Sequence, residues 1–153
     1  MIVVSDTSPI TSLAGVEKLE ILRALFDNVL IPPAVFRELE DRVALPDWIE
    51  VRNVREQAMV THLLAELDSG EAEALALARE LKADRVLIDE RHGRDVAERL
   101  GLRYIGVLGV LLEAKRRGHL EAVGPIVDAL VAKARFWVSE KLRREVLQAA
   151  GEA

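Results

Sequence analysis

Short apolar runs recur along the chain, and each is followed by a segment with the residue spacing of a helix. Ile2-Val3-Val4 is typical: it lacks the polar alternation of a half-exposed strand, so it suits a strand buried on both faces. The strands predicted from such runs lie at residues 2–4, 29–31, 48–54, 85–88, 104–105 and 136–138. Strands that alternate with helices favour a mainly parallel central sheet covered on both faces, which is a three-layer α/β/α fold.

The segments between these runs carry apolar residues three and four positions apart, which predicts helices. Ser8 suits the N-cap of the first helix, and Pro9 suits its first position. The predicted helices lie at residues 9–15, 19–26, 33–39, 62–66, 68–82, 94–100, 108–117, 123–134 and 139–149. No linker, low-complexity tract or internal repeat divides the chain, so we expect one domain over residues 1–150.

The composition limits the chemistry and the partners. The net charge of −5 excludes a basic field over the whole molecule, so any surface that binds nucleic acid must be local. No apolar run has membrane-spanning length and the N-terminus does not resemble a signal peptide, so a cytoplasmic protein without membrane contact is expected. The chain has no cysteine and three histidines, so a metal site would use oxygen ligands, which Mg²⁺ and Mn²⁺ prefer.

Four acidic residues lie at or near the ends of predicted strands and helices, where such a site can form. Asp6 and Asp89 directly follow apolar strand runs, so both should emerge at the carboxyl edge of the sheet, where ligands bind. Glu71 lies in the first turn of a helix, and Glu38 lies on the helix that follows strand 29–31. Two bare carboxylates ~4 Å apart repel by roughly 4 kcal/mol at an effective dielectric constant near 20. A divalent cation reverses this repulsion, and phosphodiester hydrolysis is the natural chemistry of such a site.

Each acid also has a purely structural interpretation. Asp6 suits the N-terminus of the following helix, and Glu71 fits a capping box with Asp68. Glu38 fits a solvated helix position, and Asp89 fits a surface turn. The four acids therefore carry more weight as a set than one by one.

The histidines, the tryptophans and most of the basic residues favour structural roles. The scattered histidines lack metal-ligand spacing, and the aromatic residues beside strand patterns favour core or dimer packing over base stacking. Arg91 and Arg94 lie near the Asp89 turn and are candidates for phosphate contact. The side chains that favour structural roles are those of His62, His92, His119, Trp48, Trp137 and the basic run 115–117.

Four segments together resemble the PIN-domain family, in particular its DUF3368 branch, which is related to VapC toxins. They read SDTSPI, IPPAVFREL, GEAEALALARELKADRVLIDER and GLRYIGVLGVLLEAKRRGHL. The resemblance extends from Ile2 to about Leu147. It implies a parallel-sheet α/β fold and an acidic cluster that binds Mg²⁺ or Mn²⁺ and hydrolyses RNA.

Matched position by position, the resemblance implies that Asp6, Glu71 and Asp89 bind metal and act in catalysis together with Glu38. Its helix-initial acid is Glu71, where many relatives have Asp. The hydroxyl that orients the first acid corresponds to Thr7 or Ser8. A fifth acid corresponds to either of two candidates, which leaves one metal ion or two undecided. These candidates are Glu90 and Asp95.

The predicted function is a Mg²⁺- or Mn²⁺-dependent endoribonuclease acting as the toxin of a toxin–antitoxin pair. The expected partners are an RNA substrate, a small antitoxin protein and a second copy of the chain. Helix 10–14 or 19–26 would supply the homodimer face, although core burial explains their apolar residues equally well. The alternatives are a non-catalytic PIN-like module that binds RNA or protein and a metal-dependent DNA nuclease.

Overall fold

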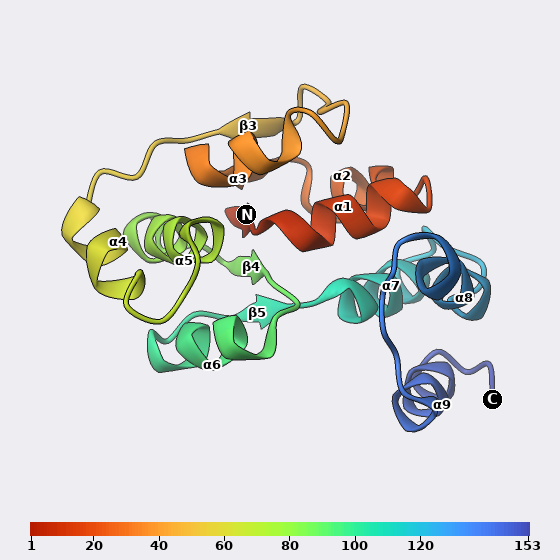
Figure 1. Cartoon of the computed structure of the whole chain (residues 1–153). Coiled ribbons are helices and arrows are strands. Elements are labelled where there is room, and N and C mark those ends of the chain that lie inside the picture. The colour runs from red at the N-terminus through yellow and green to blue at the C-terminus, as the bar shows by residue number, and fades with distance from the viewer.

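Five strands form one sheet at the centre of the molecule, and helices cover both of its faces (Figure 1). The computed structural model describes residues 1–153. The strands pair in the order β3-β2-β1-β4-β5, and every neighbouring pair is parallel. They are β1 (Val3–Ser5), β2 (Val29–Ile31), β3 (Ile49–Val51), β4 (Arg85–Leu87) and β5 (Tyr104–Ile105). The predicted three-layer α/β/α fold with a parallel sheet is confirmed.

Nine helices complete the fold, and none is long and apolar enough to cross a membrane. They are α1 (Thr7–Gly15), α2 (Glu20–Phe26), α3 (Pro33–Leu39), α4 (Gln57–Leu63), α5 (Ser69–Leu81), α6 (Arg91–Arg99), α7 (Val107–Arg116), α8 (Gly124–Lys133) and α9 (Glu140–Ala149). Several bounds differ from the prediction. Strand β3 is shorter than 48–54, α6 begins at Arg91 rather than at residue 94, and Pro9 is the third residue of α1 rather than its first. Helix α4 begins and ends earlier than 62–66, and the N-cap of α1 is Asp6 rather than Ser8.

The strands are buried on both faces because their side chains alternate between two apolar cores. In β1, Val3 belongs to the core beneath α1, α2, α7 and α8, whereas Val4 belongs to the core beneath α4, α5 and α6. Ile10 and Leu22 are fully buried in the first core, so core packing accounts for the apolar residues of α1 and α2. Each such side chain stabilises the fold by about 1.5–3 kcal/mol through its burial.

The predicted strand at 136–138 is wrong. These residues lie in an unpaired linker between α8 and α9, after Arg135 turns the chain with a φ of 54°. Phe136 and Val138 pack against the first core, whereas Trp137 is 82% exposed. This inward and outward alternation imitates the pattern of a strand, but no neighbouring strand pairs with it.

The strand order places a crevice at the carboxyl ends of β1 and β4. The chain builds β2 and β3 on one side of β1 and then β4 and β5 on the other, so the connections diverge between β1 and β4. The backbone N–H of Asp6 donates to the carbonyl of Leu87 at 2.9 Å, which holds the two strand ends side by side. Open parallel sheets bind ligands at such a point.

Candidate active site

Asp6 lies at the carboxyl end of β1 and begins α1, but its side chain does not cap that helix. The residue is only 6% exposed. Burial raises the pKa of this carboxyl to about 7, although the neighbouring Thr7 amide lowers it. Three nearby carboxylates raise the pKa further, namely Glu71, Asp68 and Glu38. Asp6 is therefore a buried acid surrounded by other acids.

Gly70 separates Asp6 from Glu38 and leaves room for both carboxylates. A Cβ atom at this glycine would lie 2.7 Å from Oε1 of Glu38 and 3.4 Å from Oδ1 of Asp6. Glu38 is exposed on α3, and its carboxylate reaches across the start of α5. The missing side chain at position 70 thus lets an acid from α3 approach the acid that follows β1.

Glu71 has the predicted capping-box role. Its backbone N–H donates to Oδ1 of Asp68 at 2.9 Å, and its own carboxylate accepts from the Asp68 N–H at 3.4 Å. Burial raises the pKa of Glu71 to about 7, with repulsion from Asp68 and Glu90 adding to the effect. Its other carboxylate oxygen faces Gly93, where a Cβ would lie 3.2 Å away. The capping box fixes the position of Glu71 and uses only one oxygen of its carboxylate, so the other oxygen takes no part in the cap.

Asp89 is held differently from the other three acids. Its Oδ1 accepts from the backbone N–H of Val107 at 2.9 Å and lies 3.5 Å from Nη2 of Arg94. Its Oδ2 is buried without a partner. Burial raises the pKa of Asp89, whereas the two partners of Oδ1 lower it. The surface-turn interpretation is wrong, because this side chain is 16% exposed and joins the end of β4 to the start of α7.

The other predicted site residues surround these acids. Thr7 is buried, and its hydroxyl has no hydrogen-bond partner, whereas Ser8 is exposed. Glu90 caps the start of α6 with its backbone and lies close enough to Glu71 to raise the pKa of that carboxyl. Asp95 is exposed on α6. Of the two candidates for the fifth acid, Glu90 thus has the electrostatic link to the cluster.

The acids suit a hard cation by their chemistry, although no three acidic or histidine side chains are gathered closely enough to enclose one. Asp6, Glu38 and Glu71 form no salt bridge with a basic residue. Beside them, the Thr7 hydroxyl and one Asp89 oxygen are buried without partners. Mg²⁺ and Mn²⁺ prefer oxygen ligands such as carboxylates and hydroxyls. The two buried oxygens have no partner in the chain that would compete with the ion. The donor set therefore fits such an ion once the carboxylates turn toward it.

Several side chains outside the acids are already engaged in the fold. Lys115 donates to Glu152 at 2.8 Å and Arg116 pairs with Glu113, so the basic run is largely occupied by structural contacts. His92 pairs with a surface glutamate, Glu66, at 3.0 Å. The other two histidines, His62 and His119, are exposed. These positions agree with the structural roles predicted for them.

The two tryptophans differ sharply in exposure. Trp48 is 8% exposed, as core packing predicts, but Trp137 is 82% exposed, so core packing is wrong for this residue. Sequence reasoning also missed the glycines beside the acids. Gly106 is one of them, since a Cβ there would lie 2.6 Å from Oδ1 of Asp89. Only the three-dimensional approach of the acids reveals why these positions lack a side chain.

The family comparison agrees with the fold. A family model described as DUF3368, PIN domain, matches residues 2–152. The chain therefore belongs to this PIN-domain family, as the sequence resemblance predicted. A search of curated proteins finds no match. PIN domains are generally metal-dependent nucleases, which is the class of chemistry that the acidic crevice suits.

Proposed function

We propose that this PIN domain is a Mg²⁺- or Mn²⁺-dependent endoribonuclease that hydrolyses RNA phosphodiester bonds. The observation that carries the proposal is the group of Asp6, Glu38 and Glu71 at the crevice between β1 and β4, where no basic side chain pairs with them. Such an arrangement is costly in a fold unless a cation binds there. Membership of a family of nucleases supports the same reaction class.

Each side chain has a role in this proposal that follows from its environment. Asp6 and Glu71 would hold the cation, with Glu38 reaching in from α3 and the Asp89 oxygen that lacks a partner completing the set. A bound divalent ion polarises a phosphoryl oxygen and lowers the pKa of a bound water. The unpaired hydroxyl of Thr7 would orient Asp6. Glu90 is our choice for the fifth acid because of its effect on Glu71.

The two arginines near Asp89 would contact the phosphate backbone of the substrate. Arg91 is exposed at the start of α6, and Arg94 is partly exposed while its Nε donates to the Ile88 carbonyl at 3.1 Å. A fixed guanidinium and a free one provide local positive charge next to the acids. Local charge is what an acidic protein needs to hold a polyanion.

We further propose that the enzyme is the toxin of a toxin–antitoxin pair, with a small antitoxin protein and a second copy of the chain as partners. The resemblance to VapC-related proteins supports this biological role. The alternative is a non-catalytic module that binds RNA or protein. One observation favours that alternative, namely that Oδ1 of Asp89 is occupied by Val107 and Arg94 rather than directed toward Asp6.

The decisive assay is cleavage of single-stranded RNA, structured RNA and DNA in Mn²⁺ or in EDTA. The variants are Asp6→Asn and Asp89→Asn, and the matched control is Asp47→Asn, which changes an exposed acid just before β3, at the opposite edge of the sheet. Asp89→Asn keeps an oxygen that can accept from Val107, so it should fold. We expect RNA cleavage that needs Mn²⁺ and that both site variants abolish.

Cleavage that survives EDTA and both site substitutions would disprove the mechanism. Cleavage of DNA in preference to RNA would assign the site to a DNA nuclease. Binding of RNA without any cleavage and without any bound metal would support the non-catalytic module. The Asp47→Asn protein should cleave as the wild type does, because that residue precedes β3 and so lies at the edge of the sheet opposite the acids.

A further inference from the structure

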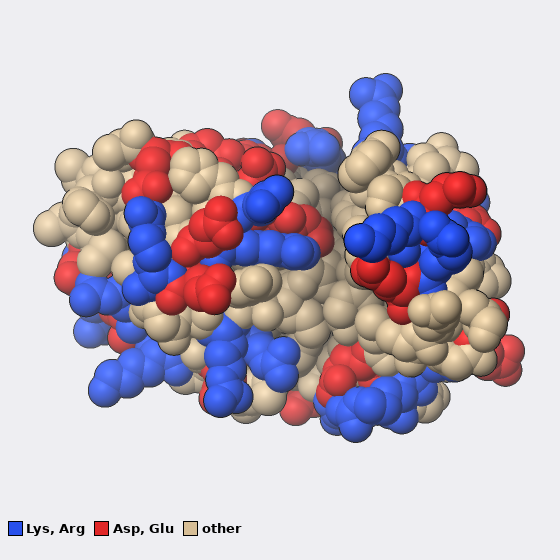
Figure 2. All heavy atoms as spheres, turned by 90° about the horizontal axis from the view of Figure 1, so that it is seen from below, with Lys and Arg blue, Asp and Glu red and all other residues tan.

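A cavity of about 760 Å³ opens directly beside Asp89. One wall comes from the start of α6 and the end of β5, and the other comes from α9 and the linker before it. In the view from below, Figure 2 shows a mostly uncharged hollow between the side that carries α6 and the side that carries α9. The cavity is as large as ordinary small-molecule sites, which occupy roughly 300–1,000 Å³.

The α6 wall of this cavity carries charges of both signs, because it is lined by Asp89 and Glu90 as well as by Arg91 and Arg94. Arg94 lies with its guanidinium 5.5 Å from the centre of the Tyr104 ring, and its hydrogen bond to Ile88 fixes that position. Arg91 lines the same wall and is exposed, and it forms no ion pair within the chain. Arg94 is therefore stacked on Tyr104 and paired with Asp89, whereas Arg91 is the cation of this wall that has no ion-pair partner.

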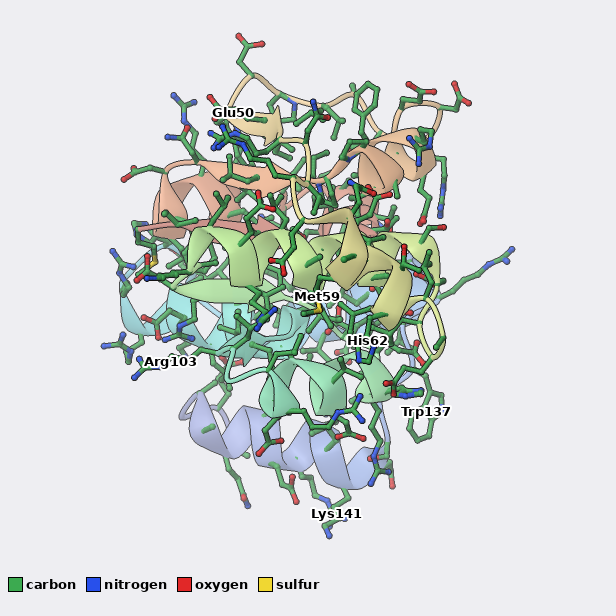
Figure 3. The ribbon with its side chains drawn as sticks, turned by 90° about the vertical axis from the view of Figure 1, so that its left-hand side faces the viewer. Glu50, Met59, His62, Arg103, Trp137 and Lys141 are labelled. Carbon is green, nitrogen blue, oxygen red and sulfur yellow. The ribbon has the colours of Figure 1, made fainter.

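The opposite wall carries the most exposed tryptophan of the chain. Phe136 packs against the core and anchors the linker, so Trp137 is held outward at the rim of the cavity with 82% of its surface exposed. In Figure 3, Trp137 and Arg103, which directly precedes β5, lie on opposite sides of the molecule. Trp137 therefore lies toward the side where β5 ends, which is also the side of the proposed active site.

We propose that this cavity is a subsite that binds one unpaired nucleotide of an RNA substrate, with the base stacked on Trp137 and a phosphate beside Arg91. Every base has a flat π face, and exposed aromatic side chains bind single strands by stacking on it. Arg91 matches the negative charge of a phosphate, and Asp89 lines the cavity as well as being one of the four acids of the proposed active site. This inference rests on the proposed function, because it places the bound strand beside the acids that would cleave it.

The test is binding of a short fluorescein-labelled single-stranded oligoribonucleotide, measured by anisotropy in EDTA so that no metal-dependent cleavage occurs. We expect Trp137→Ala to weaken binding about 10-fold and Trp137→Phe to weaken it by less than about 3-fold, because phenylalanine keeps a stacking face. The matched control is Leu64→Ala, which shortens another exposed apolar residue outside the cavity. This control should bind as the wild type does.

A second measurement separates stacking from a general effect on structure. An oligoribonucleotide with an abasic site at the bound position should bind the wild type about 10-fold more weakly than the intact strand. Trp137→Ala should then lower the affinity for the abasic strand only slightly, because the stacking partner is already missing. Quenching of Trp137 emission on binding gives an independent signal, because the other tryptophan, Trp48, is buried. Full affinity of Trp137→Ala for the intact strand would overturn the subsite.

The outcomes for the subsite and for the nuclease are distinguishable. If Trp137→Ala binds RNA normally while the wild type cleaves RNA in Mn²⁺, the subsite is wrong and the nuclease proposal stands. If the strand binds through Trp137 but is never cleaved, the subsite stands and the nuclease proposal is wrong. Equal binding of intact and abasic strands by the wild type would refute base stacking in the cavity. A protein partner would then be the better candidate for its occupant.

Discussion

Two carboxylates in this protein, Glu152 and Asp6, have opposite surroundings. Glu152 accepts hydrogen bonds from the backbone N–H groups of Val123 and Gly124 at 2.7 and 2.9 Å, and from Lys115 at 2.8 Å. These bonds lower the pKa of Glu152 to about 2. Asp6 lies among acids instead, and burial raises its pKa to about 7.

The difference between these carboxylates separates a structural role from a functional one. Glu152 joins the C-terminal end of the chain to the start of α8, and Figure 1 shows α9 lying beside α7 and α8. Asp6 contributes no comparable bond, so its ionised form destabilises the fold at neutral pH. A protein that retains such a group gains function from it rather than stability.

The largest expected effect is the loss of cleavage in Asp6→Asn. We expect RNA cleavage in Mn²⁺ to fall at least ~100-fold, because the buried carboxylate that interacts with three other acids is removed. The free energy of unfolding of the metal-free protein should rise, because a buried and uncompensated charge is also removed. Cleavage assays and urea denaturation measure the two effects.

Glu152→Gln is the matched control, since it also replaces a carboxylate by an amide. It should lower the midpoint of unfolding, because an amide binds Lys115 and two backbone N–H groups more weakly than a carboxylate does. Cleavage by the folded fraction should stay at the wild-type level. If Asp6→Asn were less stable and Glu152→Gln were inactive, the contrast between the two carboxylates would be refuted.

The pH dependence of stability should follow from Asp6 and Glu71. The pKa of each is raised to about 7 in the folded state, so the folded protein holds protons that the unfolded chain releases between about pH 4 and 7. Stability of the metal-free protein should therefore fall by roughly 5 kcal/mol as the pH rises from 5 to 8, about half of it from each carboxyl. Urea denaturation in EDTA at both values measures this change.

Mn²⁺ should restore much of the lost stability at pH 8, because it binds the ionised carboxylates of the folded state. Asp6→Asn should show a weaker dependence on pH. Glu152 does not affect the pH dependence of stability between pH 5 and 8. Its pKa is lowered, so the stabilisation that it provides is lost only as the pH falls from about 4 toward 2. If stability rose from pH 5 to pH 8 in EDTA, the claim that the acidic cluster lacks compensating charge would be refuted.

A smaller effect is expected for Gly70→Ala. The new Cβ would lie 2.7 Å from Oε1 of Glu38, so that carboxylate must move away from Asp6. We expect cleavage to fall about 10-fold, with little change in stability, because alanine favours helix more than glycine does. Ser69→Ala, at the exposed residue before it, should leave cleavage unchanged. Full activity of Gly70→Ala would show that Glu38 is not needed near Asp6.

The smallest expected effect is that of Thr7→Val. The buried Thr7 hydroxyl has no partner, so replacing it by a methyl group should leave the free energy of unfolding unchanged or raise it by about 1 kcal/mol. If the hydroxyl orients the site, cleavage should fall several-fold. Thr11→Val is the control: its hydroxyl donates to the Ser8 carbonyl at 3.1 Å, so that substitution should cost stability and leave cleavage unchanged.

The fold could be predicted from the sequence because its strands are buried on both faces. A run such as Val29-Leu30-Ile31 has one stable environment, between two layers of helices. The linker 136–138 shows the limit of this reasoning. Its side chains alternate like those of a strand, and only the absence of a pairing neighbour reveals a loop with Trp137 outside.

The candidate site could be predicted in part. Asp6 and Asp89 follow strands, so sequence alone places both at the carboxyl edge, and the capping pattern gives the position of Glu71. The bond from Val107 to Asp89 joins residues 18 positions apart, so it depends on how α7 packs. The approach of Glu38 across Gly70 likewise depends on the packing of α3 against α5.

The most direct test of the central claim is titration of the metal-free protein with Mn²⁺ near pH 7, by calorimetry in two buffers with different ionisation enthalpies. Because Asp6 and Glu71 are partly protonated at that pH, binding should release protons, and the measured heat should depend on the buffer. We expect this proton-linked binding in the wild type and its loss in Asp6→Asn. No binding by the wild type, or equal binding by Asp6→Asn, would contradict it.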